Sequence, residues 1–532
     1  SGERNTRRVS DMVKTTPASL VRHSRVYSTS EGYNNSDPLI NSISNGKASL
    51  LLQNKLLTEN LPPALVPIVN LINAQKLRTY AMGTLQVPGE LASGERVWFE
   101  VEAKLSGNEL SLWRPADDEY DAGNTEFVPK YINLTDAKVE VVTGAPELRV
   151  VQDYDNTFVL RFHSTQEHRL WLAAMYLAKY EYTSLNEAFT AVVLSLKASK
   201  LLDIHVLLSS KKRFARLEWC DLRLPQLSNR WLRVYVVITP GEAKHLGRIE
   251  MFSSEKTTKK NLVVYVSNVA NVYNVYPEHT NMIDFNAIMK LNGDIYINKN
   301  YEHYFVGADV KSFKAPSRSS SHTSLSSLVP ATGGHVRTPS ATSTSSLFSL
   351  ADNDSPRRTF SGVLSPGRQR SASSASTAST VVDTAEPKRT SSFLKKNMNG
   401  FVATNHLYLM PISHPGVPAI EIMIRNFIHI VDSFKLYGRP GHLESDKANP
   451  QSLLFALPSL PHYQYLSIDD AITLVERNFA TSMVEDWSQL QWSQAFKAAL
   501  EHKFANGRYR GSGDIAKLYG NLDLNFDEIS SP

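Results

Sequence analysis

The strongest constraint on the fold is a series of short alternating segments that ends in one amphipathic helix. Between residues 81 and 162, apolar and polar residues alternate in runs that are separated by turn signals such as Pro88-Gly89. Runs of this length and period indicate an antiparallel meander of about seven strands. A capping-box sequence at Ser164–Glu167 then begins a helix whose apolar face carries Trp171. The pattern predicts a β-rich unit closed by its C-terminal helix, with Trp171 in the core.

The same order of strands and helix recurs in the second half of the chain. A second capping-box sequence, Ser184–Glu187, predicts a separate helix that links the two series. Residues Pro418–Tyr437 have one apolar face and are expected to close the second series, with the helix that begins at Ile468 as an alternative. The strand-like segments of this series are Arg213–Leu224, Arg230–Thr239, Gly247–Phe252, Leu262–Val266, Val269–Tyr276, Ile283–Leu291, Asp294–Ile297 and, after a Ser/Thr-rich stretch, Phe401–Met410.

Seven strands followed by one amphipathic helix is the plan of a pleckstrin-homology (PH) domain, which both series resemble. The predicted fold class is therefore mainly β with α (α+β): two PH-like bent antiparallel sheets, each closed by a C-terminal helix, plus a helical connector. A C-terminal helical extension with a strand at Leu453–Pro458 is expected to pack on the second sheet.

The chain is expected to divide into nine parts. The expected boundaries are 1–48 for a disordered head, 49–74 for the connector, 75–182 for the first PH-like domain, 183–204 for the linking helix, 205–311 for the first part of the second PH-like domain, 312–397 for a disordered insertion, 398–438 for the last strand and helix of that domain, 439–506 for the extension and 507–532 for a flexible tail.

The Ser/Thr-rich insertion and the head carry the positive charge of the chain. Residues 317–392 contain 32 Ser or Thr and only two aromatic residues, a composition that cannot bury a core. This segment has a net charge of +4 and residues 1–48 have +3, whereas the whole chain has +5, which leaves −2 for the remainder. A folded nucleic-acid groove needs Lys and Arg on a structured face, so direct nucleic-acid binding is not predicted.

Motifs for catalysis, cofactors and membrane spans are missing from the sequence. There is no P-loop, GxGxxG, HExxH or GxSxG motif, and no run of about 18 apolar residues. The single cysteine, Cys220, excludes a disulfide framework and a cysteine-based zinc site. We therefore predict a soluble non-enzymatic protein of a reducing compartment, without cofactor or metal, and we expect the chain to be a piece of something longer.

Basic residues in the second PH-like series suggest a phosphoinositide site, because PH folds bind such headgroups with cationic side chains near their first strands. The first loop of the first series, Pro88–Arg96, holds two Glu against one Arg and is poorly suited to this role. The alternative interpretation is that the basic residues are solvated charges at strand edges. The candidate residues are Lys211, Lys212, Arg213, Arg230, Lys256, Lys259 and Lys260, with Arg216 and Arg233 nearby.

The head and the insertion are rich in phosphoacceptor patterns. Some are proline-directed and others follow Arg or Lys, and their density in a segment too polar to fold is more informative than any one of them. Each phosphate adds about −1.5 to −2 charges, so two or three cancel the net charge of the insertion. We predict a charge-switched docking segment that protein kinases modify. The candidate sites are Ser10, Thr338, Ser355, Ser361, Ser365, Ser371, Ser373 and Ser391.

Several segments resemble the fungal Skg/Caf-type PH-domain proteins, which associate with the carbon-catabolite-repression–Not (Ccr–Not) deadenylase complex and the bud cortex. The resemblance rests on Tyr182–Thr190, Arg216–Gln226, Arg230–Tyr235 and Asn449–Pro458, and it extends over about Leu50 to Gly507 without the insertion. It implies an adaptor without enzymatic activity, with protein partners in the Ccr–Not complex or at the bud cortex. It also implies a cytoplasmic pool with enrichment at the bud neck, bud tip or cell cortex.

These observations lead to two hypotheses of function. The first is a tandem PH-domain scaffold that is regulated by phosphorylation of its insertion. The second is a peripheral membrane protein whose second PH domain binds phosphoinositides, in which case Arg230 and Lys256, Lys259 and Lys260 would be required for cortical localisation.

Overall fold

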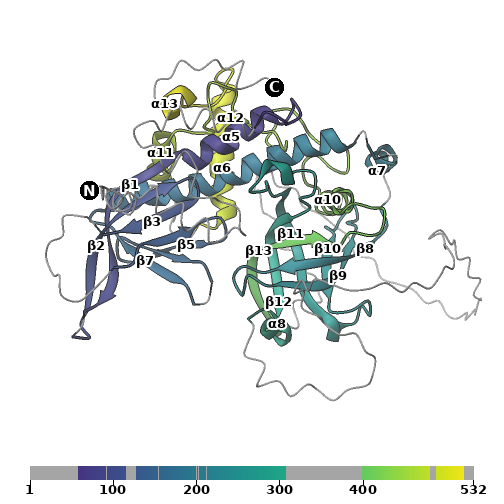
Figure 1. Ribbon diagram of the computed structural model, residues 1–532, viewed down its shortest axis with the longest axis horizontal. Coiled ribbons are helices and arrows are strands. Elements are labelled where there is room, and N and C mark those ends of the chain that lie inside the picture. Colours follow the sequence, from purple (N-terminus) through teal and green to yellow (C-terminus); the bar gives the residue numbers. More distant parts are fainter. Residues whose placement is uncertain are drawn as a thin grey trace, which may run out of the picture. The chain divides into compact units, whose positions relative to one another are not determined.

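The computed structural model describes residues 58–91, 93–114, 127–153, 155–198, 200–201, 203–210, 213–306, 398–479 and 487–519, and Figure 1 shows their arrangement. The predictions for the head, the insertion and the end of the tail concern residues outside this described part. Within it, antiparallel sheets covered by helices confirm the predicted α+β fold class.

The first sheet has seven antiparallel strands in the order β4-β3-β2-β1-β7-β6-β5. Strands β1 and β7 are joined through the pair Gln86 and Arg161. Alternate side chains such as Val101 and Leu148 fill its core. Helix α5 (Val66–Leu77) precedes strands β1 (Thr79–Glu90), β2 (Arg96–Ser106), β3 (Glu109–Trp113), β4 (Lys130–Asn133), β5 (Lys138–Val142), β6 (Glu147–Val151) and β7 (Thr157–Arg161).

Helix α6 (Thr165–Ala198) closes this sheet and continues to the second one. Its start agrees with the predicted capping box, because the Glu167 amide donates to Ser164 Oγ at 3.2 Å, and Trp171 is buried as predicted. The prediction of a separate linking helix that begins at Ser184 is wrong, since α6 is one helix of 34 residues. The side-chain amide of Asn186 donates to the Tyr182 carbonyl oxygen at 2.8 Å, which is a contact within a continuous helix and not a cap at a helix start.

The second sheet is a closed barrel in the order β10-β11-β12-β13-β8-β9. It has fewer strands than predicted, because two pairs of predicted segments are single strands interrupted by bulges, at residues 266–271 and 292–295. The elements are α7 (Ile204–Ser209), β8 (Arg216–Arg223), β9 (Trp231–Thr239), β10 (Arg248–Phe252), η1 (Lys259–Asn261), β11 (Leu262–Asn274), η2 (Thr280–Met282), β12 (Met289–Asn298), η3 (Lys299–Tyr301), α8 (Glu302–Val306), η5 (Met398–Gly400), β13 (Phe401–Pro411) and α10 (Ala419–Phe434).

The two ends of the barrel differ in what covers them (Figure 1). At the helix end, α10 packs on the barrel, and the Gly247 amide of the β9–β10 loop donates to the Ser433 carbonyl oxygen at 2.8 Å. At the insertion end are the β8–β9 loop, the β10–β11 loop and the short helix α8, which contacts β9. We use the names helix end and insertion end below.

The C-terminal extension packs against α5 and α6 rather than on the barrel. Tyr176 of α6 stacks on Trp492 with ring centroids 4.6 Å apart. The alternative in which the helix from Ile468 closes the second sheet is therefore wrong, because α10 does so. Leu453–Pro458 forms turns instead of the predicted strand, and Ala456 has a φ of 57° there. The extension consists of α11 (Ile468–Phe479), α12 (Gln489–Ala505) and α13 (Ile515–Tyr519).

Candidate functional site: the basic residues of the barrel and the contacts between the two sheets

The basic residues that the sequence suggests for phosphoinositide binding are divided between the two ends of the barrel. Arg213 precedes the start of β8 at the helix end, whereas Arg230 precedes the start of β9 at the insertion end. The eight residues of β8 separate them, which corresponds to roughly 26 Å of extended chain. Lys211 and Lys212 adjoin Arg213 in sequence and lie outside the described residues.

The Arg213 side chain is largely buried and makes its contacts within the fold. This side chain, which is 8% exposed, forms an ion pair with Asp432 of α10 and donates to the Leu207 carbonyl oxygen. Asp432 also accepts from Arg439, with 2.7 Å between Arg439 Nε and Asp432 Oδ1. Arg439 donates in turn to the Leu208 carbonyl oxygen at 2.8 Å. These contacts hold α7 against α10 and direct Arg213 away from solvent.

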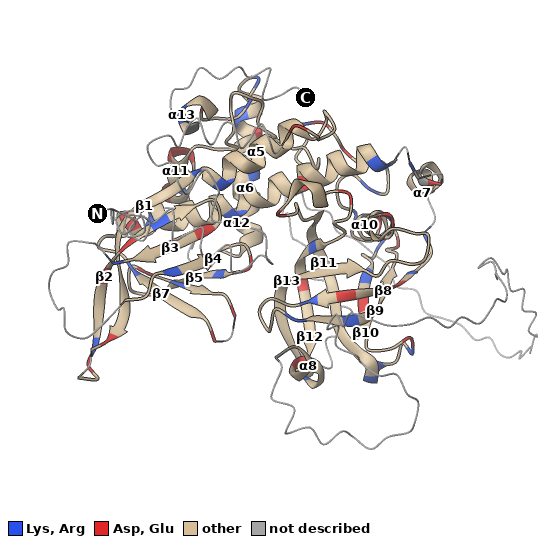
Figure 2. Ribbon diagram, in the orientation of Figure 1, with Lys and Arg blue, Asp and Glu red and all other residues tan. Residues whose placement is uncertain are grey.

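The other four described candidates lie at the insertion end and are exposed: Arg230, Lys256, Lys259 and Lys260. The β10–β11 loop that carries the three lysines is held by Asn261, whose Nδ2 donates to the Lys256 carbonyl oxygen at 2.8 Å. The acidic residue of this loop, Glu255, accepts a hydrogen bond from Trp219 Nε1 at 3.1 Å. In Figure 2, basic residues in blue mark this end of the barrel.

The insertion starts and returns next to this lysine-bearing loop. The hydroxyl of Tyr301, in η3, donates to the Lys260 carbonyl oxygen at 2.7 Å, and Phe305 of α8 is fully buried. On the return side, Lys299 Nζ donates to the Asn399 carbonyl oxygen at 3.0 Å. Sequence reasoning missed these contacts, although the aromatic run Tyr301–Phe305 directly before the Ser/Thr-rich stretch is a signal for them.

The predicted phosphoacceptors do not belong to the described part of the chain. This applies to all eight of them: Ser10, Thr338, Ser355, Ser361, Ser365, Ser371, Ser373 and Ser391.

A polar contact between the first sheet and the barrel is centred on Asp136, in the loop between β4 and β5. The Tyr408 hydroxyl donates to Asp136 Oδ1 at 2.5 Å, and Lys290 Nζ lies 3.3 Å from the same oxygen. Arg223 Nη2 lies 3.8 Å from Asp136 Oδ2, and His406 Nε2 lies 3.5 Å from Oδ1. The outer face of β8, β12 and β13 therefore surrounds one carboxylate from the first sheet.

This Asp136 cluster has more cationic than anionic groups. Burial raises the pKa of Asp136, but Lys290 and its other neighbours lower the pKa by more, to about 2. Burial and Lys290 lower the pKa of His406 to about 3, so its ring is neutral. Lys179 of α6 donates to the carbonyl oxygens of Leu134 and Ala137, both at 2.6 Å, and burial together with Lys290 lowers the pKa of Lys179 to about 7.

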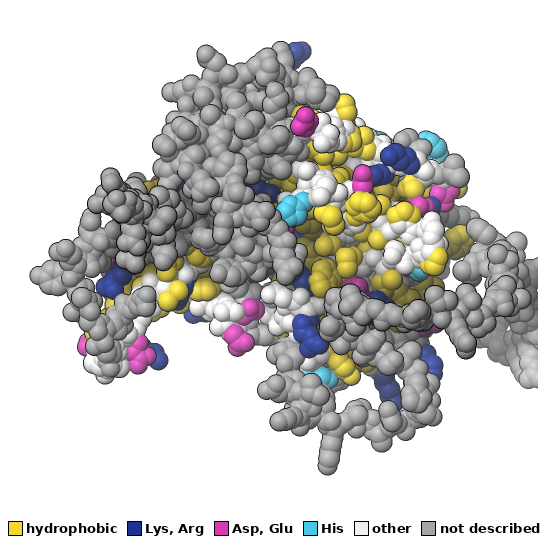
Figure 3. All heavy atoms as spheres, in the orientation of Figure 1, with side chains coloured by type: hydrophobic (Ala, Val, Ile, Leu, Met, Phe, Trp, Pro, Cys, Tyr) yellow, Lys and Arg dark blue, Asp and Glu magenta, His cyan; other side chains and the backbone are white. Residues whose placement is uncertain are grey.

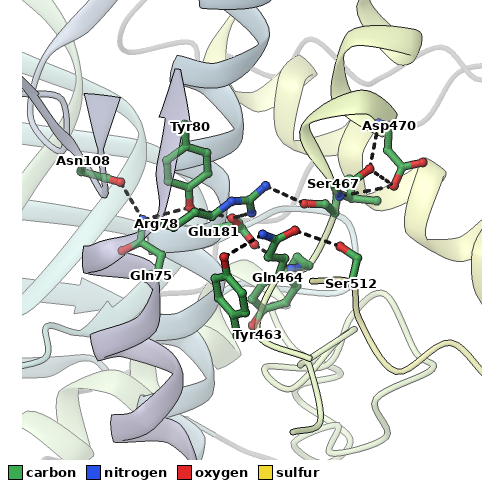
Figure 4. A network of polar contacts seen from close by, with 12 residues as sticks. Gln75, Arg78, Tyr80, Asn108, Glu181, Tyr463, Gln464, Ser467, Asp470 and Ser512 are labelled. Atoms are coloured by element: carbon green, nitrogen blue, oxygen red, sulfur yellow. Dashed lines mark hydrogen bonds and ion pairs between the residues drawn. The ribbon is translucent and has the colours of Figure 1, made fainter. Parts of the chain in front are cut away.

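A second buried network joins α5, β1, α6 and the C-terminal extension (Figure 4). Arg78 forms an ion pair with Glu181, and both side chains are nearly inaccessible to solvent. Glu181 also accepts from the Tyr80 hydroxyl and from the Tyr465 amide, at 2.6 Å in both cases. Burial lowers the pKa of Arg78, but Glu181, Tyr80 and Tyr463 together raise it by more. Burial also raises the pKa of Glu181, against which the Arg78 guanidinium and the two donors favour its ionised form. Arg78 donates in addition to the Leu466 carbonyl oxygen at 3.0 Å.

The described residues provide neither a cluster of metal-binding side chains nor a membrane-spanning helix. These residues contain no group of three or more His, Cys, Asp or Glu side chains placed to hold a metal ion. None of their helices is both long enough and apolar enough to span a membrane.

The barrel and α10 form a fungal PH-like domain. Residues 200–331 and 378–455 match the family model of that description, and the break in the match falls inside the Ser/Thr-rich insertion. A solution structure of the PH domain of human pleckstrin homology domain-containing protein family A member 5 covers 19% of this chain and 77% of its own length, at 19% identity. Its TM-score is 0.15.

The wider resemblance to Caf-type fungal PH proteins is confirmed. The chain is 25% identical over 495 residues to the CCR4-NOT transcriptional complex subunit CAF120 of Saccharomyces cerevisiae, in the strains YJM789 and S288c. This match covers 87% of the chain but 37% of CAF120, so the chain spans little more than a third of that relative. An uncharacterized protein of the same yeast is 27% identical over 320 residues, which cover 56% of the chain and 52% of that protein.

Proposed function

We propose that this chain is a non-enzymatic adaptor built on tandem PH-like domains, and that phosphorylation of its insertion regulates partner binding. The observation that carries the proposal is that Tyr301, just before the insertion, bonds to the β10–β11 loop with its exposed lysines, and that Asn399, just after the insertion, bonds to Lys299 at the same end of the barrel. The similarity to a CCR4-NOT subunit supports a role within a protein complex. We extend the proposal to partners in that complex or at the bud cortex, and to a cytoplasmic protein enriched at the bud neck, bud tip or cell cortex.

The regulation rests on a change in the sign of the charge of the insertion. Without phosphate, residues 317–392 carry +4 and are repelled by Lys256, Lys259 and Lys260. Two or three phosphates, at about −1.5 to −2 each, make the segment neutral or acidic. The phosphates then form charge-assisted hydrogen bonds with the lysines next to the insertion roots. The bound insertion covers the insertion end and competes with any partner that binds there.

A peptide titration tests the phosphate recognition. The ligand is a synthetic peptide of residues 351–375 with phosphate on Ser355, Ser361 and Ser365, added to the unphosphorylated full chain. We expect the phosphopeptide to bind at least about tenfold more tightly than the unmodified peptide, because the phosphates add several charge-assisted hydrogen bonds. The double variant Lys256→Ala/Lys259→Ala removes this preference, and the control Lys138→Ala/Lys200→Ala keeps it. Equal affinities of the two peptides would contradict the regulation.

A second experiment tests the adaptor role in fungal cells. The full chain and a variant with Ala at all eight predicted phosphoacceptors are each purified by affinity from growing cells, and their partners are compared. The proposal predicts that CCR4-NOT proteins accompany the chain and that the variant retains more of a partner that the phosphorylated insertion displaces. If no CCR4-NOT protein is purified with the chain, the adaptor role is contradicted. If the full chain and the variant retain identical amounts of their partners, the regulation is contradicted.

A second candidate function is phosphoinositide binding by the barrel, which the exposure of Arg230 and the three loop lysines favours. In that case the full chain sediments with vesicles that contain phosphoinositides, and Lys256→Ala/Lys259→Ala/Lys260→Ala abolishes both this binding and cortical localisation. If no phosphoinositide vesicle retains the chain at low salt, this candidate is eliminated. If the triple variant keeps its cortical localisation, the adaptor interpretation is favoured.

A further inference from the structure

Large apolar side chains point into solvent around the helix end of the barrel. Phe214 is 84% exposed, Val206 is 68% exposed and Leu246 is 46% exposed, and Leu217, which is 51% exposed, follows Phe214 closely in sequence. We call these four residues the helix-end patch. Isolated exposed apolar residues are common on protein surfaces, so the question is whether these four belong to one surface.

Contacts with the last turn of α10 bring the members of the patch together. Asp432 pairs with Arg213, the neighbour of Phe214. Arg213 also donates to the carbonyl oxygen of Leu207, the neighbour of Val206. The Ser433 carbonyl oxygen accepts from Gly247, the neighbour of Leu246, at 2.8 Å. Three separate segments therefore meet at one helix end, and each presents an apolar side chain to solvent. In Figure 3, yellow apolar side chains reach the surface over the barrel, with dark blue basic side chains among them.

The segments that form the patch are basic. Residues 203–217, 240–250 and 432–435 contain seven Lys or Arg and four Asp or Glu, which is a net charge of +3. Of the seven, Lys211 and Lys212 lie outside the described residues, and Arg213 is paired with Asp432. Lys244 and Lys435 are both exposed, and Lys435 Nζ donates to the Ala243 carbonyl oxygen at 3.4 Å, which places it at the β9–β10 loop. By contrast, the acidic residues include Asp432, which is buried with Arg213 and Arg439, and Asp203, which pairs with Arg425 at 2.7 Å.

This combination of features fits a membrane surface better than a protein partner. Protein interfaces also favour aromatic residues, but they are depleted in Lys relative to the rest of the protein surface. Membrane interfaces instead combine aromatic and aliphatic side chains, which enter the headgroup layer, with Lys and Arg, which bind anionic lipids. Long basic side chains at the edge of the patch can keep their charge in water while their stems lie along apolar surface.

We propose that the helix-end patch docks on the surface of an anionic lipid bilayer. Phe214, Val206 and Leu246 enter the headgroup layer, and the surrounding Lys and Arg side chains contact anionic headgroups without selecting one lipid. This surface is separated by the length of β8 from the lysines of the insertion end. The proposal is therefore independent of the phosphate recognition proposed above, and either one can fail without the other.

Vesicle sedimentation of the full chain tests the docking. The vesicles are phosphatidylcholine alone, phosphatidylcholine with phosphatidylserine, and phosphatidylcholine with a phosphoinositide. We expect binding to the phosphatidylserine vesicles that weakens as salt is added, and no binding to phosphatidylcholine alone. Phe214→Ser is expected to reduce the partition by about tenfold, because a buried Phe contributes at least that much. The control is Met82→Ser, since Met82 is 68% exposed on β1 of the first sheet, away from the helix end of the barrel.

Two results would overturn the proposal. One is that phosphatidylserine vesicles fail to retain the wild-type chain, including the case in which only phosphoinositide vesicles do so through Lys256, Lys259 and Lys260. The other is that Phe214→Ser and Met82→Ser bind equally well. Both side chains are exposed, so the thermal unfolding midpoint is expected to be unchanged and to exclude misfolding as the cause of a loss.

Site-specific labelling provides a second, more direct measurement. Cys220 is the single cysteine of the chain and is buried, so an environment-sensitive fluorophore on Phe214→Cys reports on that position alone. Phosphatidylserine vesicles are expected to shift its emission to shorter wavelength, whereas the same label on Met82→Cys stays in water. An unshifted spectrum at Phe214→Cys while the chain is vesicle-bound contradicts the assigned face. A shift produced by a protein partner instead of vesicles would assign the patch to that protein and overturn the lipid proposal.

Discussion

The Glu181 network and the Asp136 cluster both join segments that are far apart in sequence, but they balance charge differently. In the Glu181 network one carboxylate meets one guanidinium, and neutral groups supply the remaining hydrogen bonds. In the Asp136 cluster one carboxylate faces Lys290 and Arg223, with Lys179 close by. A balanced buried pair is insensitive to pH near neutrality, whereas a cation-rich cluster responds by losing protons.

The largest effect is expected for Arg78→Met, which leaves Glu181 buried without its cation. Breaking a buried ion pair from one side typically costs about 3–5 kcal/mol of unfolding free energy. The double variant Arg78→Met/Glu181→Met is expected to recover most of this loss, because no charge then remains buried. Chemical denaturation of the three proteins measures both values. If the double variant is as unstable as the single one, the network is not a charge-balanced pair.

A smaller loss is expected for Asp136→Asn, of about 2 kcal/mol, because the carboxylate is partly exposed and water can replace part of its contacts. The same substitution removes the only carboxylate from a group of cations, so it is expected to make the stability depend more strongly on pH above neutrality. Denaturation at two pH values measures both effects. A variant as stable as the wild type would show that the two sheets are held together without this contact.

Lys179 is expected to make the protein more stable as the pH rises above 7. Its pKa is about 7 in the folded chain but has the ordinary value of 10.5 in the unfolded chain. Between these values the unfolded state binds more protons, so the free energy of unfolding increases with pH, by about 1 kcal/mol per unit. Lys179→Met is expected to flatten this slope between pH 7 and 9. An equally steep slope in the variant would assign the effect to other groups.

His406 is expected to make the protein less stable at the acidic side. Its folded pKa of about 3 lies below the ordinary 6.5, so the unfolded state binds the extra proton between these values and stability falls as the pH decreases. The expected loss is about 1 kcal/mol per pH unit from 6.5 to 4, and Asp136 adds to it only below its unfolded pKa of 3.8. Equilibrium unfolding of wild type and His406→Gln over this range checks the assignment, because the variant should lose less.

Local patterns predicted the elements of the fold well, and contacts between distant residues explain what they missed. The alternation of strands and the Ser164 capping box depend on neighbours, so they could be found from the sequence. Ser184 has the same local signal, but here packing on both sheets continues the helix through it. Segments separated by a bulge were predicted as two strands, because a bulge interrupts the alternation without ending the ladder.

The candidate site was predictable only in part, for the same reason. Exposed lysines in a loop, such as Lys259, are visible in the sequence. The partner of Arg213 is not, because Asp432 lies 219 residues away, beyond the insertion. Asp136 lies in a short polar loop that resembles any other loop, and its role depends on side chains that two later strands bring to it.

Helix α6 belongs to both sheets, and this affects how the chain unfolds. Its 34 residues extend about 51 Å and contact β1 and β6 of the first sheet as well as β11 of the barrel. Neither sheet can lose its half of the helix without exposing the apolar surface that the helix covers. We therefore expect the two sheets to melt in a single cooperative transition, with equal calorimetric and van't Hoff enthalpies. A fragment that contains only one of the two sheets would expose the apolar part of α6 that packs on the other sheet. We expect such a fragment to aggregate rather than fold.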